Sequence, residues 1–427
     1  MQSLLIKNGL VIDPVSGEAL RDILIEGRRI SRLARRVKPP PGCLVFDAAG
    51  LWVFPGFIDA HVHAREPGAE AAETLESAAR AAAAGGITSA LLMPNTAPAL
   101  ATAALVRKYR RRAAGLPVNL YFSAAATAGR SGKKISNLPA LKKAGALAFT
   151  DDGSCLPRGL LARLINKAAV LGLPLLDHPE DFFRTGRGVI NAGPAARRLG
   201  LPGIPPEAEL FAVLRDLLSA SSAGPLHLQH LSLASSVGAL RAAKKLGWPV
   251  TGETCPHYFA LSDADIKADD ADYKMKPPLR SPADRRAVLA AIADGTIDLI
   301  ASDHAPHEGR LKARGFGRAP FGIIGLETLA PLCVTELVLK KLITKMRLAE
   351  LASFNPARLL GLKRKGRLCH GFDADLTILD PGRLKRVPGA FVSKSANSPF
   401  KGAPLRGWPA ATIVGGKMVF RASRAIC

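Results

Sequence analysis

Short apolar runs alternate with longer stretches rich in Ala, Leu and Arg through the middle of the chain. Brief apolar runs bounded by turn residues are typical of buried strands, whereas the longer stretches are typical of helices. Eight such runs occur, at 52–58, 87–93, 118–124, 146–150, 173–177, 226–229, 250–253 and 297–301. Eight strand–helix units in succession predict an α/β fold, a (β/α)8 barrel of the TIM type.

The two ends of the chain have a different pattern. Residues 1–54 and 363–427 contain short alternating runs separated by turn residues, which is typical of exposed β-sheets. We predict that both ends together form one small β-sandwich domain beside a barrel that occupies 55–362. The helical stretches 325–343 and 346–361 are expected to close the barrel before the chain returns to the sandwich.

Composition excludes several classes of protein. The chain has 427 residues, of which 48% are hydrophobic and 22% charged, so a disordered or fibrous chain is excluded. The six cysteines form no CxxC pair, which argues against a disulfide scaffold or a zinc ribbon and favours a reducing compartment. The sequence shows neither a signal-peptide pattern nor a long uninterrupted apolar run. We therefore expect a cytoplasmic protein without a membrane partner.

The net charge of +24 raises the question of nucleic-acid binding. The basic runs at 107–112, 241–245 and 363–367 are short, far apart and poor in neighbouring aromatic residues. No helix-turn-helix, RRM or zinc-finger spacing accompanies them. We expect no nucleic-acid partner, and interpret the charge as a solvated basic surface that speeds the arrival of anionic metabolites.

His61 and His63 follow the first predicted barrel strand. Residues i and i+2 of an extended chain point to the same face, so both imidazoles can converge on one point. A lone HxH pair is a weak indication of a metal site. The position of the other candidate residues strengthens it.

Four further candidates stand at the ends of later predicted strands. Asp152 follows strand four, His178 and His230 end strands five and six, and Asp303 ends strand eight. Taken singly, such a histidine is more typical of a satisfied core residue, and such an aspartate of a turn or helix cap. In a barrel, however, these strand ends form the single face that carries active sites. The candidate metal ligands are His61, His63, Asp152, His178, His230 and Asp303.

This set of side chains favours a particular metal. Imidazole and carboxylate ligands without thiolate fit zinc, with manganese or cobalt as substitutes. Six ligands exceed the needs of one tetrahedral ion. Two ions about 3.5–4 Å apart would use them all, so we expect two zinc ions per subunit.

Nine motifs spread over nearly the whole chain carry a resemblance to a known family. They are GFIDAHVHAREPG (56–68), LLMPNTAP (91–98), AFTDDG (148–153), HPED (178–181), HLQHLS (227–232), YKMKPPLRSPADR (273–285), SDHAPH (302–307), APFGIIGLET (319–328) and GWPAATIVGGK (407–417). The chain resembles the class I dihydroorotases of bacteria, in the amidohydrolase superfamily. The resemblance implies reversible, zinc-dependent cyclisation of N-carbamoyl-L-aspartate to dihydroorotate with release of water, the third step of pyrimidine biosynthesis.

The resemblance also implies a role for each candidate ligand. His61 and His63 would bind the first zinc, and His178 and His230 the second. Asp152 would bridge the two ions. Asp303 would touch the first zinc and act as the general acid and base, taking a proton from water and delivering it to the leaving ring nitrogen.

The resemblance implies further residues that hold the substrate. Arg65 stands two residues after His63, and its planar guanidinium matches a carboxylate in bidentate fashion. Taken alone, it is equally well a surface arginine of a basic protein. The implied substrate-binding residues are His63, Arg65, Asn95, His307, the backbone of Phe321 and Gly322, and Lys276. Lys276 departs from the family, which commonly has Asn at this position.

Two other functions stay open. A hydantoinase or allantoinase would share the fold, but such enzymes usually bridge their metals with a carboxylated lysine, and AFTDDG offers none. A non-catalytic subunit that supports aspartate transcarbamoylase would be expected to lose metal ligands, whereas this chain keeps all six. An active enzyme can also form a homodimer or bind that transcarbamoylase, and the sequence does not decide between these partners.

Overall fold

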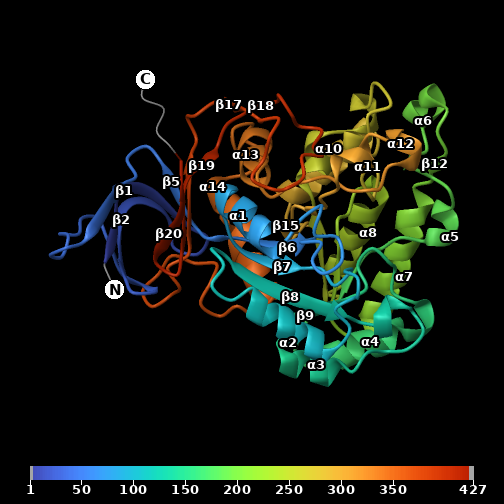
Figure 1. Ribbon diagram of the computed structural model, residues 1–427, viewed down its shortest axis with the longest axis horizontal. Coiled ribbons are helices and arrows are strands. Elements are labelled where there is room, and N and C mark those ends of the chain that lie inside the picture. Colours follow the sequence, from blue (N-terminus) through green and yellow to red (C-terminus); the bar gives the residue numbers. More distant parts are fainter. Residues whose placement is uncertain (1–2, 423–427) are drawn as a thin grey trace.

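The computed structural model describes residues 3–422, and two four-stranded parallel sheets form its centre (Figure 1). The first sheet contains β6 (Phe57–Val62), β7 (Ile87–Leu92), β8 (Asn119–Ala125) and β9 (Ala148–Thr150). The second contains β10 (Leu176–Asp177), β13 (Leu226–Leu228), β14 (Val250–Thr254) and β15 (Leu299–Ile300). Seven of these strands stand at predicted positions, and β6 overlaps only the end of the predicted run 52–58.

Backbone hydrogen bonds join the two sheets at both of their edges. The Phe149 N–H donates to the Pro174 carbonyl at 3.0 Å, which links β9 to the segment before β10. The His63 N–H donates to the His304 carbonyl at 2.9 Å, which links the end of β6 to the segment after β15. The eight parallel strands therefore close into a barrel, and the predicted fold is confirmed.

The first predicted barrel strand has the wrong bounds. The run 52–58 is divided at Gly56 into β5 (Trp52–Pro55), which pairs with strands of the chain ends, and β6, which begins the barrel. A Cβ atom at Gly56 would lie 2.2 Å from the Thr88 hydroxyl oxygen, so only glycine fits where the chain passes from one sheet to the other. Continuous apolar character hid this division because both halves are buried.

Helices surround the barrel and cover its strands (Figure 1). The longer ones are α1 (Leu75–Ala84), α2 (Ala103–Arg112), α3 (Leu138–Ala144), α4 (Arg158–Val170), α7 (Glu207–Ala223), α8 (Ala234–Lys245) and α10 (Pro282–Ala293). Local sequence sets their starts, since Thr74 and Ser281 each cap a helix with a side-chain oxygen. Helices α13 (Leu329–Cys333), α14 (Lys345–Ala349) and α15 (Asn355–Leu359), with π-helical turns at Val334–Val338 and Glu350–Phe354, follow the last strand.

Short elements occupy the loops. The helices among them are α5 (Phe182–Thr185), α6 (Pro194–Leu199), α9 (Pro256–Ala260), α11 (Gly309–Lys312) and α12 (Gly315–Arg318). The 3-10 turns are Ala128–Arg130, Asp263–Asp265 and Ala271–Tyr273. Two small sheets pair β11 (Ile190–Asn191) with β12 (Gly203–Ile204), and β17 (Lys385–Arg386) with β18 (Pro404–Leu405).

Both chain ends contribute to one eight-stranded sheet, seen at one side of the barrel in Figure 1. Its strands are β1 (Leu4–Asp13), β2 (Gly17–Glu26), β3 (Arg29–Ala34), β4 (Leu44–Asp47), β5, β16 (Leu376–Asp380), β19 (Trp408–Val414) and β20 (Lys417–Arg421). The Ile30 N–H donates to the Phe372 carbonyl at 3.0 Å, so the sheet curls back around its own apolar core. The division into domains at 54/55 and 362/363 stays a prediction.

The segment between β16 and β19 lies against the loops of the barrel. The Asn397 side-chain amide donates to the carbonyls of Ala305 and Gly322 at 3.2 and 3.0 Å. The Ser395 hydroxyl donates to the Ala72 carbonyl at 2.8 Å. The C-terminal part of the chain therefore supports loops that follow the barrel strands.

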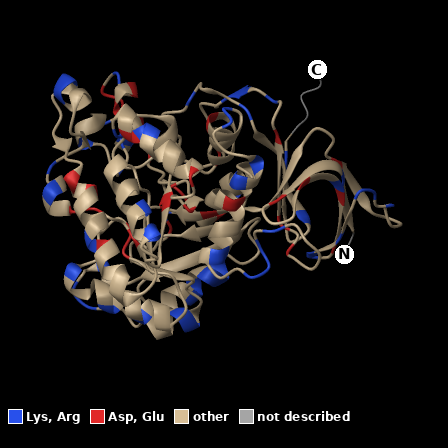
Figure 2. Ribbon diagram, turned by 180° about the vertical axis from the view of Figure 1, so that it is seen from behind, with Lys and Arg blue, Asp and Glu red and all other residues tan. Residues whose placement is uncertain are grey.

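Charge is distributed around the outside of the molecule. Figure 2 shows Lys and Arg scattered over the outer helices and connecting loops. This agrees with a solvated basic surface. Within residues 3–422, none of the helices has both the length and the apolar character needed to span a bilayer.

Candidate active site

Six predicted ligands meet at the carboxyl ends of the barrel strands. The structure places His61 Nε2 3.3 Å from Asp152 Oδ1 and 3.5 Å from Asp303 Oδ1. His63 Nε2 lies 3.1 Å from Asp303 Oδ1 and 3.6 Å from Asp152 Oδ2. Side chains that are far apart in the sequence thus form one cluster, because the parallel strands all end on one face.

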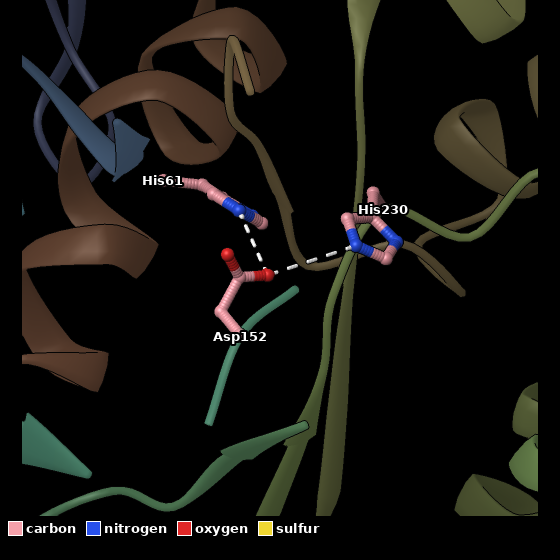
Figure 3. Close-up of side chains that lie close together, drawn as sticks. All are labelled: His61, Asp152 and His230. Atoms are coloured by element: carbon pink, nitrogen blue, oxygen red, sulfur yellow. Dashed lines mark ion pairs between the residues drawn. The ribbon is translucent and has the colours of Figure 1, made fainter. Parts of the chain in front are cut away.

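His178 and His230 complete the cluster on its other side. His178 Nδ1 lies 3.6 Å from Asp152 Oδ1, and His230 Nε2 lies 4.0 Å from the same oxygen. Figure 3 shows Asp152 between His61 and His230, with its carboxylate directed toward both rings. Asp152 therefore lies between His61 on one side of the cluster and His178 and His230 on the other.

Two ring nitrogens of the cluster lack a hydrogen-bond partner. His61 Nε2 and His230 Nδ1 are both buried and have none among the described residues. His230 Nε2 and His178 Nδ1, by contrast, form a hydrogen bond of 2.7 Å with one another. Buried polar atoms without partners are rare in folded proteins. The donor set of imidazoles and carboxylates fits a zinc-type metal centre.

The carboxylates of the cluster are held in the charged form. Burial alone would raise the pKa of Asp152, but His61 and His178 bring it well below its ordinary value. Burial also opposes the charge of Asp303, yet His61 and His63 lower its pKa strongly. Both aspartates therefore offer ionised oxygens, which is the form that binds a metal.

The histidines divide into two groups. Burial tends to keep them neutral, but Asp152 and Asp303 raise the pKa of His61 well above its usual value, and Asp152 and Glu180 raise that of His178 to about 9. Burial and the neighbouring His178 lower the pKa of His230 to about 3. The acidic groups thus favour positive charge in the cluster, and these side chains form groups that could hold a metal cation.

Three candidate residues have a strained backbone. Arg65, His230 and Asp303 have φ angles of 59°, 37° and 47°, a region that residues other than glycine rarely adopt. Such conformations cost about 1–3 kcal/mol each and persist where the surrounding fold enforces them, often at functional sites. The fold thus directs these side chains at a cost in stability.

Two glutamates hold histidines of the cluster in place. Glu253 Oε1 lies 2.7 Å from His61 Nδ1, and Glu180 Oε2 lies 2.8 Å from His178 Nε2. Sequence analysis missed both glutamates, although each stands at a strand end or in the motif that supplies a histidine. Metal-binding histidines usually make such a contact through their second ring nitrogen, so a search for acids near each strand end would have found them.

Asn95 also contacts the cluster. Its Oδ1 lies 2.9 Å from His63 Nδ1, and its Nδ2 lies 3.4 Å from Asp152 Oδ2. The sequence predicted a substrate contact for this residue. The structure adds that Asn95 fixes the ring of His63.

The cluster opens into a cavity of about 250 Å³. Arg65, Asn95, Lys276, Phe321 and Gly322 line it together with all of the candidate ligands except His61. This volume suits a small metabolite, and the predicted substrate-binding residues named here share its wall.

Arg65 and His307 contact one another beside this cavity. Arg65 Nε donates to the Pro306 carbonyl at 3.0 Å, and its Nη2 lies 3.2 Å from His307 Nε2. Burial and the Arg65 charge lower the pKa of His307 to about 3, so this imidazole is neutral. His307 Nε2 also lies 2.8 Å from the Phe321 carbonyl, so His307 connects Arg65 with the loop at Phe321.

The loop at Phe321 and Gly322 is held by the chain itself. The Gly322 N–H donates to the Lys274 carbonyl at 3.0 Å. A Cβ atom at Gly322 would lie 2.7 Å from the Ala305 Cβ, and its φ of 133° also favours glycine. Lys276 also lines the cavity, and its Nζ lies 3.1 Å from Glu180 Oε1.

Comparisons with known proteins show the family to which the chain belongs. A sequence profile described as dihydro-orotase-like matches residues 50–236, and one for the amidohydrolase family matches residues 214–419. The dihydroorotase of Pelotomaculum thermopropionicum is 44% identical over 98% of both chains. The chain belongs to the dihydroorotase family. Another relative in the family, the dihydroorotase of Bacillus caldolyticus, is 42% identical over 98% of this chain and 99% of its own.

Solved structures share the fold at lower identity. The L-hydantoinase of Arthrobacter aurescens has a TM-score of 0.89 and 27% identity, covering 100% of this chain and 98% of its own. A dihydropyrimidinase from Brevibacillus agri has a TM-score of 0.86 and 25% identity, with coverages of 98% and 95%. The dihydroorotase family thus shares its architecture with other enzymes that are named for cyclic amides.

Proposed function

We propose that the chain is a dihydroorotase, which interconverts N-carbamoyl-L-aspartate and dihydroorotate in pyrimidine biosynthesis. The observation that carries this proposal is the meeting of six ligand-type side chains with Arg65 and Asn95 around one small cavity. Whole-chain similarity to dihydroorotases at 41–44% identity supports it.

Two zinc ions are the cofactor that the side chains favour. His61, His63 and Asp303 would hold one ion, and His178 and His230 the other, with Asp152 shared between them. When bound, such ions polarise a carbonyl and lower the pKa of water toward about 7.

Asp303 is positioned to carry the proton. In hydrolysis, the oxygen of water adds to the ring carbonyl carbon and the ring C–N bond breaks. The Asp303 carboxylate would accept the proton from water and pass it to the departing nitrogen, and cyclisation would reverse these steps. The lowered pKa of Asp303 favours the ionised form that accepts a proton first.

Arg65 gives the cavity its preference for an acid. Its guanidinium would bind the carboxylate of the substrate, with His307 and Asn95 as neighbouring polar groups. Burial lowers the pKa of Arg65 only to about 10, so the side chain stays charged at neutral pH. The backbone of Phe321 and Gly322 would lie along the ring.

The function is tested by turnover of dihydroorotate and by zinc content in the purified protein. We expect two zinc ions per chain and activity in both directions, lost on treatment with a chelator and restored by zinc. A protein that binds zinc but leaves dihydroorotate unchanged would contradict the proposal.

The hydantoinase-like architecture supplies a second candidate. Its best support is the TM-score of 0.89 to an L-hydantoinase. The same assay with hydantoin or allantoin in place of dihydroorotate separates the two functions. We expect no more than trace activity on these uncharged rings, because they leave Arg65 without a carboxylate.

A further inference from the structure

The two sides of the histidine cluster are supported in different ways. Glu253, which contacts His61, is buried within the barrel at 1% exposure and also contacts His227 Nε2 at 3.1 Å. Glu180, which contacts His178, is also buried, but it pairs with Lys276, which lines the cavity. The support of His178 is therefore linked to the cavity through Lys276.

Glu180 has three partners that share its two oxygens. His178 Nε2 lies 2.8 Å from Oε2, while the Thr185 hydroxyl donates to Oε1 at 2.5 Å. The third partner is Lys276, whose Nζ lies 3.1 Å from Oε1. With Nε2 directed at Glu180, the other nitrogen of His178 points to Asp152 and His230.

A second route also leads from Lys276 to His178. Lys276 Nζ lies 4.7 Å from the ring centre of Phe182, and the His178 ring stacks on Phe182 with 5.9 Å between ring centres. Lys276 Nζ also lies 4.8 Å from the ring centre of Phe321. One ammonium group thus contacts a carboxylate and two aromatic faces, which holds it away from open solvent.

We infer that Lys276 is a positioning residue that fixes His178 through Glu180 and Phe182, and so strengthens metal binding on the His178–His230 side of the cluster. This inference rests on the metal centre described under the proposed function. It gives the lysine a role other than direct contact with substrate.

The physical reason is the orientation of the imidazole. Removing the ammonium group leaves Glu180 with two partners and frees it to turn toward water in the cavity. His178 then loses a fixed acceptor for its Nε2 proton, and its ring samples orientations in which Nδ1 no longer faces Asp152. Loss of such a supporting contact typically weakens metal binding about 10–100-fold.

Zinc binding to the metal-free full chain, measured by competition with a chromophoric chelator, tests the inference without any substrate. We expect Lys276→Met to weaken one of two zinc-binding steps about tenfold, at the lower end of that range, and to leave the other step unchanged. Glu180→Gln should weaken the same step at least as much. Lys276→Arg should keep the zinc affinity of that step close to that of the unchanged protein, since arginine keeps the positive charge.

Lys401→Met is the matched control. Lys401 forms an ion pair with Asp272 at 2.7 Å, away from Glu180 and Phe182. The zinc affinities of both binding steps in Lys401→Met should equal those of the unchanged protein. Lys276→Gln serves as a second variant if the methionine variant does not fold, as judged by circular dichroism.

Three results would overturn the inference. The first is unchanged zinc binding in the Lys276 variants, which would remove the positioning role. The second is unchanged zinc binding together with a higher KM for dihydroorotate, which would assign the lysine to the substrate. The third is equal weakening of both zinc-binding steps, which would show a general structural effect. If one step weakens selectively but the zinc-loaded protein does not turn over dihydroorotate, the proposed function fails while the inference stands.

Discussion

Single residues in the site are held in conformations that cost stability. Arg65, His230 and Asp303 have positive φ angles, and Asp152 is an ionised carboxylate buried among imidazoles. Local sequence preference does not favour these states. The surrounding barrel enforces them, and the chemistry of the site depends on that enforcement.

Asp303→Asn tests the proton-transfer role. The amide keeps an oxygen near His61 and His63 but cannot accept and return a proton. We expect zinc content to stay near that of the unchanged protein while both directions of the reaction become undetectable. Rates close to normal would remove Asp303 from this role.

Arg65→Met tests recognition of the substrate carboxylate. The change removes the guanidinium group and keeps an unbranched side chain. Activity on dihydroorotate should fall by far more than activity on dihydrouracil, which lacks the carboxylate. A charge-assisted bidentate contact is worth about 1.5–3 kcal/mol, or roughly 10–150-fold in kcat/KM. Equal losses on the two rings would show that Arg65 acts on the fold rather than on the carboxylate.

At the scale of elements, the loops after the strands need anchors of their own. Helix α7 supplies one through Glu209, which is 1% exposed and accepts hydrogen bonds from the Ser232 and Leu233 N–H groups at 3.0 and 3.2 Å. The Arg280 guanidinium pairs with the same carboxylate at 3.3 Å. One buried glutamate thus connects a helix with the loop that follows His230.

Glu209→Ala is expected to destabilise the protein strongly. It leaves the Arg280 charge buried without its acid and two N–H groups without an acceptor. Removing one partner of a buried ion pair costs about 3–5 kcal/mol in the free energy of unfolding. Urea unfolding measures this loss, and Glu207→Ala, an exposed glutamate in the same helical turn, is the control that should change little. Similar midpoints for both variants would contradict the anchoring role.

At the scale of the whole molecule, contacts between distant parts of the chain join the end sheet. Asp13, at the end of β1, accepts a hydrogen bond from the Leu368 N–H at 2.7 Å and pairs with Arg367 at 3.0 Å. Burial by itself would raise the pKa of Asp13. The contacts with Arg367, Leu368 and the nearby turn lower it below its ordinary value.

The lowered pKa gives a pH dependence with a definite sign. Because the folded-state pKa lies below the unfolded-state value of about 3.9, the stabilisation is complete above that value and is lost as pH falls through the folded-state pKa. Asp13→Asn should lower the free energy of unfolding by about 1–3 kcal/mol at pH 7, with the difference shrinking in strong acid. Urea unfolding across pH measures both. A difference that is independent of pH would show that the charge of Asp13 is not the cause.

Much of the barrel and its cluster could be predicted, because strand runs and strand-end residues are local features of the sequence. The six ligand candidates lie together as expected, although their individual roles stay predictions. The division at Gly56 could not be predicted, since both halves of that run are equally apolar. Glu180 and Glu253 stand near strand ends, so a search for acids there would have offered them as candidates, but only the structure shows which histidine each one contacts.

The sequence by itself determined the succession of strands and helices, the chemical types at each strand end and the absence of a lysine in AFTDDG. Only the tertiary structure decided which atoms face one another, such as Lys276 with Glu180, and His230 with His178. The physical reason is that side-chain types follow from the order of residues. Distances across the mouth of the barrel depend instead on how all eight strands close, and no single segment encodes that closure.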